Sequence, residues 1–229
     1  MKTRYSRNEK VIGKIGQERL KNGSVLVIGC GALGSPAAMY LAGAGVGRIG
    51  IVDFDTIDPT NLQRQLFYRE ADAGKSKAVT LANRMRELNS EVEVEYLETL
   101  LTSRNGRQII SAYDFVIEAT DNPSSKYLID ELCHDCKKPV TIGGVVGMRG
   151  QVTTYVPGHK RFSDFFPVPP EEQGVLPCSI EGVLGPAAGV ISSIQASEAI
   201  KFISDTGTLL TDRLLLIDLT ADGFSLLDY

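Results

Sequence analysis

Three glycines follow the apolar run of residues 24–28 and are spaced for contact with a phosphate: Gly29, Gly31 and Gly34. Glycines in a strand-to-helix turn let backbone N–H groups approach a phosphate at the positively charged end of the helix. Asp53 lies about 20 residues farther on, after a second apolar run, where a carboxylate would accept hydrogen bonds from both hydroxyls of a ribose. This spacing predicts a nucleotide site, whereas the glycines alone would fit any tight turn.

The segment after Asp53 is dense in polar side chains that could hold a triphosphate. They are Asp55, Asn61, Arg64 and Gln65. Arg64 offers a planar fork of donors to phosphate oxygens, and Lys77, at the start of a helical segment, could reach the same phosphates. A dinucleotide pyrophosphate is normally held by backbone N–H groups and needs no such set of cations. The set therefore favours a nucleoside triphosphate over NAD, although each residue taken alone would also fit a solvated surface.

A third candidate position lies at the end of the strand predicted for residues 113–119. Asp121 and Asn122 follow this strand, and open α/β sheets bind ligands beyond the carboxyl ends of their strands. The Asp121 carboxylate could hold a Mg²⁺ ion that bridges the phosphates of ATP. Alternatively, Asp121 or Asn122 caps the helix that begins after Pro123. Both functions can be present if different residues carry them.

The cysteines predict thiols rather than a disulfide framework or a metal centre. Cys133 and Cys136 have the CxxC spacing of half a zinc site, but the sequence holds no second pair, so we expect no zinc site. Cys178 lies in a proline-rich stretch, residues 157–182, without an adjacent Lys, Arg or His to lower its pKa. Any activation of Cys178 must come from tertiary neighbours, and an unreactive loop thiol is the alternative.

Alternating strand-like and helix-like segments must position these residues. Strands are predicted at 24–28, 48–52, 92–97, 113–119 and 139–142, and helices at 35–44, 75–88, 104–111 and 124–137. This alternation predicts an α/β fold with a Rossmann-like, doubly wound, mostly parallel sheet.

The rhythm changes after Gly147. A strand at 151–156 is followed by the long loop at 157–182, a helix at 185–203 and additional antiparallel strands at 213–219 and 224–227 in the C-terminal part. We expect one domain over residues 1–229, with a nucleotide-binding part at 1–156, a crossover loop at 157–182 and a closing part at 183–229.

Composition excludes several classes of protein. The chain has 229 residues, of which 43% are hydrophobic and 23% charged, and this composition is not that of an intrinsically disordered chain. Its formal charge of -4 provides no overall basic field for nucleic acid or an anionic membrane. No apolar run approaches the roughly 18 residues of a membrane span, and the N-terminal residues lack the apolar stretch of a signal peptide. We therefore expect a cytoplasmic protein without membrane or nucleic-acid partners.

Taken together, these motifs resemble the ubiquitin-activating-enzyme-like adenylyltransferases of the ThiF, MoeB and HesA type, and ThiF most closely in kind. The resemblance covers about residues 4–219. It rests on the motifs Arg4-Tyr5-Ser6-Arg7, residues 29–36, 53–65 and 74–77, Thr120-Asp121-Asn122, Gly150-Gln151, Gly185-Pro186 and residues 195–201. An NAD dehydrogenase would share only the glycine turn.

The resemblance implies adenylation, with ATP and Mg²⁺, of the C-terminal glycine carboxylate of a ubiquitin-like sulfur carrier that ends in Gly-Gly. It implies roles for eight residues beyond the glycine turn: Asp53 on the ribose, Asn61, Arg64 and Lys77 on the triphosphate, Asp121 on Mg²⁺, and Asp55, Gln65 and Asn122 as further nucleotide contacts. Arg7 matches an arginine that family members supply in trans across a dimer interface, so a homodimer is implied. Cys178 matches a cysteine that, in some members, joins the carrier covalently.

The resemblance leaves the pathway open. Thiamine thiazole synthesis is the main interpretation, and molybdopterin synthesis is the alternative. The chain ends soon after the last predicted strand, so a separate protein is expected to donate the sulfur. Three further alternatives remain: activation of a carboxylate on a tRNA-attached group, an NAD-dependent oxidoreductase that releases no pyrophosphate, and a non-enzymatic module that holds a nucleotide as a structural ligand.

Overall fold

A single twisted sheet forms the centre of the protein. The computed structural model describes residues 3–168 and 182–229, and within these ranges eight strands lie in the order β3-β2-β1-β4-β5-β6-β7-β8. Five strands run parallel to one another: β1 (Ser24–Ile28), β2 (Arg48–Val52), β3 (Glu93–Leu97), β4 (Phe115–Glu118) and β5 (Val140–Val146). Three strands then add in antiparallel fashion: β6 (Arg149–Tyr155), β7 (Arg213–Asp218) and β8 (Gly223–Asp228). The predicted α/β, mostly parallel fold with antiparallel C-terminal strands is thus confirmed.

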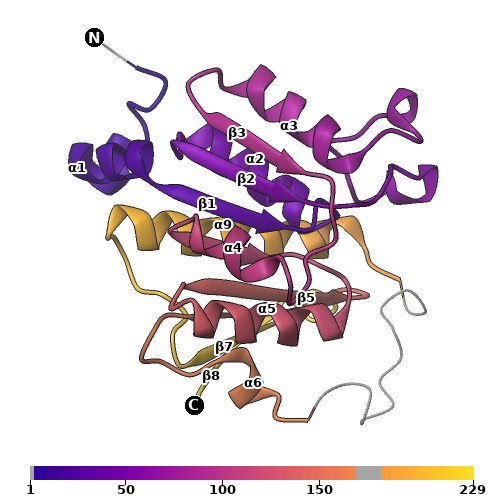
Figure 1. Cartoon of the computed structure of the whole chain (residues 1–229). Coiled ribbons are helices and arrows are strands. Elements are labelled where there is room, and N and C mark those ends of the chain that lie inside the picture. Colours follow the sequence, from indigo (N-terminus) through magenta and orange to yellow (C-terminus); the bar gives the residue numbers. More distant parts are fainter. Residues whose placement is uncertain (1–2, 169–181) are drawn as a thin grey trace.

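Helices cover both faces of the sheet (Figure 1). One layer holds α1 (Glu9–Asn22), α2 (Gly34–Ala44), α3 (Lys77–Leu88) and α9 (Gly185–Ser204). The opposite layer holds α4 (Gly106–Ser111), α5 (Pro123–Asp135) and the short α6 (Phe162–Phe165). Two 3-10 turns, η1 (Pro59–Asn61) and η2 (Glu70–Asp72), lie between β2 and α3.

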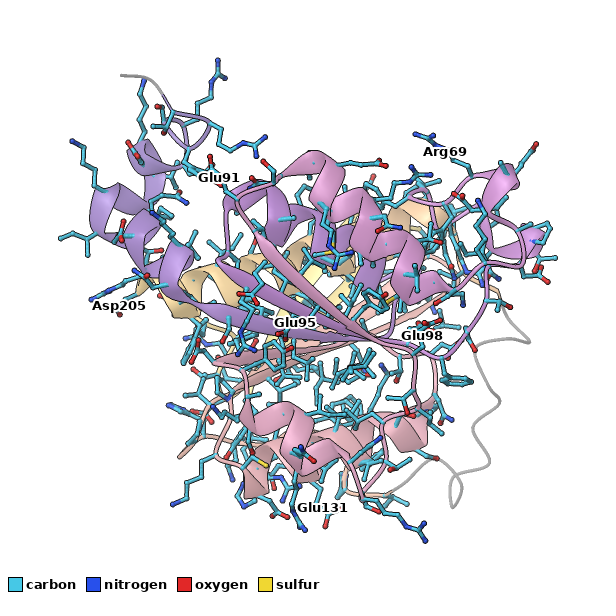
Figure 2. All side chains as sticks on the ribbon, turned by 45° about the horizontal axis from the view of Figure 1, so that its top comes forward. Arg69, Glu91, Glu95, Glu98, Glu131 and Asp205 are labelled. Carbon is cyan, nitrogen blue, oxygen red and sulfur yellow. The ribbon has the colours of Figure 1, made fainter. Side chains whose placement is uncertain are left out.

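The central strands are apolar throughout because both of their faces are covered. In β1, Val25 and Val27 pack into the core beneath α2 and α9, whereas Leu26 and Ile28 pack into the core beneath α4 and α5. This alternation follows from the two-residue period of a strand. Figure 2 shows that charged side chains such as Arg69, Glu91 and Glu131 lie on the outside.

The strand order changes direction between β1 and β4, because β2 lies on one side of β1 and β4 on the other. The loops after these two strands diverge, and ligands of doubly wound sheets bind at this place. We call it the switch point. The two loops touch there, since a Cβ atom added to Gly29 would lie 2.7 Å from the carbonyl oxygen of Ala119.

Two helices, α1 and the short α6, have no counterpart among the predicted elements. The four residues of α6 lie inside the stretch 157–182, which the sequence predicts to be a loop. The longer helix is α1. Its apolar pattern is weak because Gly16, Gln17 and Leu20 are its buried residues, and it is kinked at Gly13, where φ is 72°. Glycine adopts such a positive φ at little cost, so the chain can bend there. Among the described residues, no helix has the length and apolar character needed to cross a membrane.

Candidate functional site

The glycine turn at the end of β1 is shaped by two different constraints. A Cβ atom on Gly34 would lie 1.7 Å from the carbonyl oxygen of Gly29, and Gly29 itself has a φ of 96°, so the protein's own packing requires both glycines. Gly31 is different, because a Cβ atom there would meet only Gln65 Nε2 at 3.5 Å. The protein's own packing therefore does not require a glycine at position 31, and the room left beside its backbone fits a phosphate cradle.

Asp53 is held against this turn at the carboxyl end of β2. Its Oδ2 accepts a hydrogen bond from the Cys30 backbone N–H at 2.6 Å, and its Oδ1 accepts one from the Asp55 backbone N–H at 2.7 Å. Burial is the larger effect and raises the pKa of Asp53 above its usual value, and these two hydrogen bonds offset only part of that rise. The predicted ribose ligand is thus placed beside the glycine turn, with its orientation set by backbone donors.

Lys77 supplies a cation at the same place. It is the first residue of α3, which is capped by Ser76, whose Oγ accepts a hydrogen bond from the Val79 N–H at 3.3 Å. Lys77 Nζ lies 3.0 Å from Asp55 Oδ2, and the lysine side chain is only 8% exposed. The partner carboxylate is half-exposed, so an incoming anion can compete with it for the ammonium group.

Asn61, Arg64 and Gln65 lie on a compact turn that begins at η1. The Asn61 carbonyl accepts hydrogen bonds from the backbone N–H groups of Arg64 and Gln65, at 3.1 and 3.0 Å. Gln65 is only 4% exposed, with Nε2 toward Gly31 and with no hydrogen-bond partner for Oε1 among the described residues. An unpaired buried oxygen is costly, so Gln65 Oε1 requires a hydrogen-bond donor that water or a polar ligand can supply. The Arg64 guanidinium donates to the Thr60 carbonyl at 3.2 Å and remains partly exposed.

The turn after β4 shows which of its two polar residues caps the following helix. Asn122 caps α5, because its Oδ1 accepts a hydrogen bond from the Ser124 N–H at 2.9 Å. In the part of the chain that the structure describes, the exposed Asp121 carboxylate has no hydrogen bond or ion pair. Its oxygens fit the preference of Mg²⁺ for hard carboxylate ligands. Asp121 therefore retains the capacity to bind a cation beside the switch point.

Cys30 offers no reactive group despite its position in the turn. It is fully buried, and burial raises the pKa of its thiol well above the usual value. Tyr68 donates a hydrogen bond to the Cys30 carbonyl at 2.7 Å, and burial also raises the pKa of Tyr68. Both groups are protonated at neutral pH, so neither serves as nucleophile or base, and they support the turn by packing.

One predicted site residue, Arg7, does not join this group. Arg7 is exposed, and its neighbour Asn8 donates from Nδ2 to the Ala44 carbonyl at 3.4 Å, at the far end of α2. Because α2 rises by about 1.5 Å per residue, that end lies roughly 15 Å from the glycine turn. Cys178 falls outside the described residues.

The CxxC pair lies far from this group, at the end of α5. Cys133 is buried and Cys136 is partly buried. Within the described ranges, no three His, Cys, Asp or Glu side chains are grouped to hold a metal ion.

Sequence reasoning missed a buried ion pair at the end of β4, three residues before Asp121 in the chain. Glu118, the last residue of β4, is fully buried, and its Oε2 lies 2.6 Å from Lys126 Nζ on α5. A glutamate in an otherwise apolar strand was the available signal, because a buried carboxylate needs a partner. The identity of that partner depends on how α5 packs on β4.

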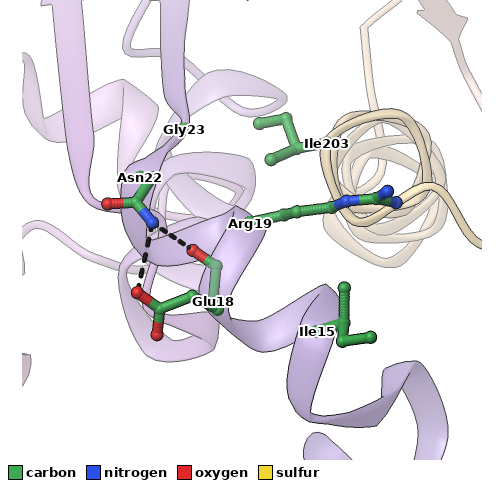
Figure 3. A pocket seen from close by; sticks show the side chains of 6 residues that line it. All are labelled: Ile15, Glu18, Arg19, Asn22, Gly23 and Ile203. Carbon is green, nitrogen blue, oxygen red and sulfur yellow. Dashed lines mark hydrogen bonds between the residues drawn. The ribbon is translucent and has the colours of Figure 1, made fainter.

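A shallow hollow of about 420 Å³ lies between α1 and the end of α9 (Figure 3). It includes Gly23, which precedes β1, so it lies at the opposite edge of the sheet from the switch point. Its one basic residue, Arg19, donates to Asp205 Oδ2 at 2.8 Å. The basic group of this hollow is therefore already paired with a carboxylate.

Comparisons with known proteins agree with this geometry. The model of the ThiF family matches residues 5–227. The adenylyltransferase and sulfurtransferase MOCS3 of Anopheles gambiae is 44% identical over 218 residues, which is 94% of this chain and 49% of that protein. The protein of the same name from Arabidopsis thaliana is 45% identical over 205 residues, or 89% of this chain and 44% of that protein. The chain thus spans about half the length of the curated relatives it matches.

Solved structures show the same fold at lower identity. The crystal structure of E. coli MccB with ATP superposes with a TM-score of 0.87 at 24% identity, covering 100% of this chain and 72% of that one. The structure of PaaA superposes with a TM-score of 0.81 at 21% identity, covering 98% of this chain. These likenesses support the architecture alone.

Proposed function

Since the chain belongs to the ThiF family, we propose that it is an adenylyltransferase that uses ATP and Mg²⁺ to activate the C-terminal glycine carboxylate of a ubiquitin-like sulfur carrier. The observation that carries the proposal is the room that the protein's own atoms leave at Gly31, where an added Cβ atom would meet only Gln65 Nε2 at 3.5 Å. The MOCS3 relatives, named adenylyltransferase and sulfurtransferase, support the class of reaction.

The proposed binding mode uses each group where it now lies. The Asp53 carboxylate accepts hydrogen bonds from the ribose hydroxyls, and the backbone N–H groups around Gly31 donate hydrogen bonds to phosphate oxygens. Lys77, which now pairs with Asp55, and Arg64 neutralise the triphosphate, with Asn61, Gln65 and Asn122 as further polar contacts. Asp121 is proposed to hold Mg²⁺, which supplies positive charge to the phosphates.

The chemistry needs positioning and cations more than proton transfer. The attacking carboxylate is already ionised at neutral pH, so no general base is required. Its approach to an α-phosphate brings negative charges together, and the cations of Lys77 and Arg64 offset that repulsion. The high pKa of the Cys30 thiol agrees with this, because the glycine turn then provides no competing nucleophile.

The relatives change our choice between the two pathways. Their shared name, MOCS3, favours the molybdopterin alternative over thiamine thiazole synthesis, which was the main interpretation from sequence. We accordingly propose that the carrier is one that delivers sulfur to molybdopterin. Cys178 as a site of covalent linkage to the carrier stays a prediction.

ATP/pyrophosphate exchange tests the proposed reaction directly. We expect the purified protein to incorporate labelled pyrophosphate into ATP only when a carrier ending in Gly-Gly is present, because adenylation of the carboxylate is reversible until the acyl adenylate is consumed. A carrier extended by one residue after Gly-Gly is the matched control. ATP binding without exchange by any carrier would contradict the proposed reaction, and hydride transfer with NAD would replace it.

We further propose a homodimer in which Arg7 acts on the partner's nucleotide. Arg7 lies near the far end of α2 from its own glycine turn, too far for one side chain to span. A largely apolar hollow of about 710 Å³ lies beside Asn8, between α2 and α9, and includes Met39, Tyr40 and Ile200. A second copy seated on this face would cover the apolar surface and bring in another Arg7.

A mixed dimer separates action in trans from action in cis. We expect Arg7→Ala and Asp121→Ala each to abolish exchange as homodimers. When the two variants are co-expressed with different tags and the mixed dimer is isolated, one of its sites combines an intact Asp121 with the partner's intact Arg7. That dimer is expected to regain about half of the parent's exchange. Failure to regain any exchange would show that Arg7 does not act across the interface.

A further inference from the structure

We propose that Glu118, Thr120 and Lys126, which we call the β4 clamp, form a positioning device for the Asp121 carboxylate. Lys126 extends from α5 toward the end of β4, and its ammonium group has three acceptors. Nζ donates to Glu118 Oε2 at 2.6 Å, to the Thr120 carbonyl at 2.8 Å and to the Gly143 carbonyl on β5 at 2.7 Å. All three N–H bonds of the ammonium are therefore used.

The other carboxylate oxygen of Glu118 also holds the turn after β4, through Thr120. Glu118 Oε1 accepts hydrogen bonds from both the backbone N–H and the hydroxyl of Thr120. The Glu118 carbonyl in turn accepts a hydrogen bond from Gln195 Nε2 of α9 at 2.6 Å. Thr120 is thus fixed by its N–H, its hydroxyl and its carbonyl, and the next residue in the chain is Asp121.

Burial makes this arrangement rigid and expensive to break. The Glu118 side chain is 0% exposed and the Lys126 side chain 12% exposed. A buried ion pair seldom stabilises a protein more than apolar side chains of the same volume would, whereas removal of one partner leaves a lone buried charge. Its bonds to Thr120, the residue before the proposed Mg²⁺ ligand, give this pair a different use, because groups that hold the surroundings of a metal ligand help to set that ligand's orientation.

The inference rests on the proposed role of Asp121, and it makes Lys126 a positioning residue that touches neither ATP nor metal. Loss of the clamp should leave the glycine turn, Asp53 and Lys77 in place. It should therefore weaken the contribution of Mg²⁺ to ATP binding while leaving the Mg²⁺-free affinity unchanged. A merely structural role predicts a lower melting temperature without this selective change.

Calorimetric titration with ATP, in Mg²⁺ and in EDTA, tests the clamp without a carrier. The measured quantity is the ratio of the ATP affinity in Mg²⁺ to the ATP affinity in EDTA. We expect Lys126→Met to lower this ratio by about tenfold, as we also expect for Asp121→Ala, while the affinity in EDTA stays unchanged. Lys137→Met, which removes an exposed lysine just after α5, is the matched control and should behave as the parent.

A double variant separates positioning from stability. Glu118→Gln combined with Lys126→Met leaves no lone buried charge, so its melting temperature should recover relative to Lys126→Met alone. The effect of Mg²⁺ on ATP affinity should stay lost, because the hydrogen bonds that Lys126 donates to the Thr120 and Gly143 carbonyls are still absent. A double variant with the parent's Mg²⁺ effect would overturn the inference.

The same titrations keep the two levels of proposal apart. If Asp121→Ala retains the parent's Mg²⁺ effect, the proposed role of Asp121 is wrong and the clamp falls with it. Suppose that the clamp variants behave as expected but that none of the carriers tested supports pyrophosphate exchange by the parent. The inference then stands and the proposed reaction does not.

Discussion

Replacement of Asp121 by alanine is expected to lower ATP/pyrophosphate exchange by about 100-fold or more, with the fold intact. The carboxylate has no hydrogen bond or ion pair among the described residues, so its removal leaves no buried group without a partner. What is lost is the anionic ligand for Mg²⁺ where negative charge gathers in the reaction. Exchange rates at several Mg²⁺ concentrations measure the loss of activity, and a circular dichroism spectrum checks that the fold is intact.

Glu131→Ala serves as the activity control for Asp121→Ala, and Asn122→Ala serves only as a comparison of stability. Glu131→Ala removes an exposed carboxylate from α5 itself and should leave exchange unchanged. Asn122→Ala removes the helix cap and should cost about 1 kcal/mol of stability. Full activity in Asp121→Ala, or equal loss in Glu131→Ala, would show that the proposed assignment of Mg²⁺ to Asp121 is wrong.

Gly34→Ala is expected to lose stability, whereas Gly31→Ala is expected to keep its stability and lose ATP affinity. The new Cβ atom at Gly34 would lie 1.7 Å from the Gly29 carbonyl oxygen and 3.2 Å from Val27 Cγ1. The strand and helix would have to separate, so we expect a loss of about 3 kcal/mol or more in the free energy of unfolding. Chemical denaturation measures this loss.

Gly31→Ala meets no such obstacle, because Gln65 Nε2 at 3.5 Å is at ordinary contact distance. Its stability should change by no more than about 0.5 kcal/mol. The added methyl group occupies the face that we assign to phosphate, so ATP affinity should fall by about tenfold or more, equivalent to about 1.4 kcal/mol. A destabilised Gly31→Ala variant with the parent's ATP affinity would contradict the proposed path of the nucleotide over the turn.

Local sequence features predicted the elements that carry the site. The apolar runs before Gly29 and Asp53 became β1 and β2 because both faces of a parallel strand are buried and need no polar alternation. Lys77 begins a helix because Ser76 caps it, and this signal is local. By contrast, α1 escaped prediction because it is mostly exposed and bends at Gly13, so its sequence lacks a regular apolar stripe.

The sequence by itself determined the fold class, the glycine turn and the chemical types of the candidate ligands, because these depend on composition and on spacing within one βαβ unit. Only the tertiary structure decided which groups are already engaged. It assigned the cap to Asn122, placed Arg7 far from the glycine turn of its own chain, and paired Glu118 with Lys126. Hydrogen bonds and burial join residues from separate elements, and no local pattern along the chain specifies those partners.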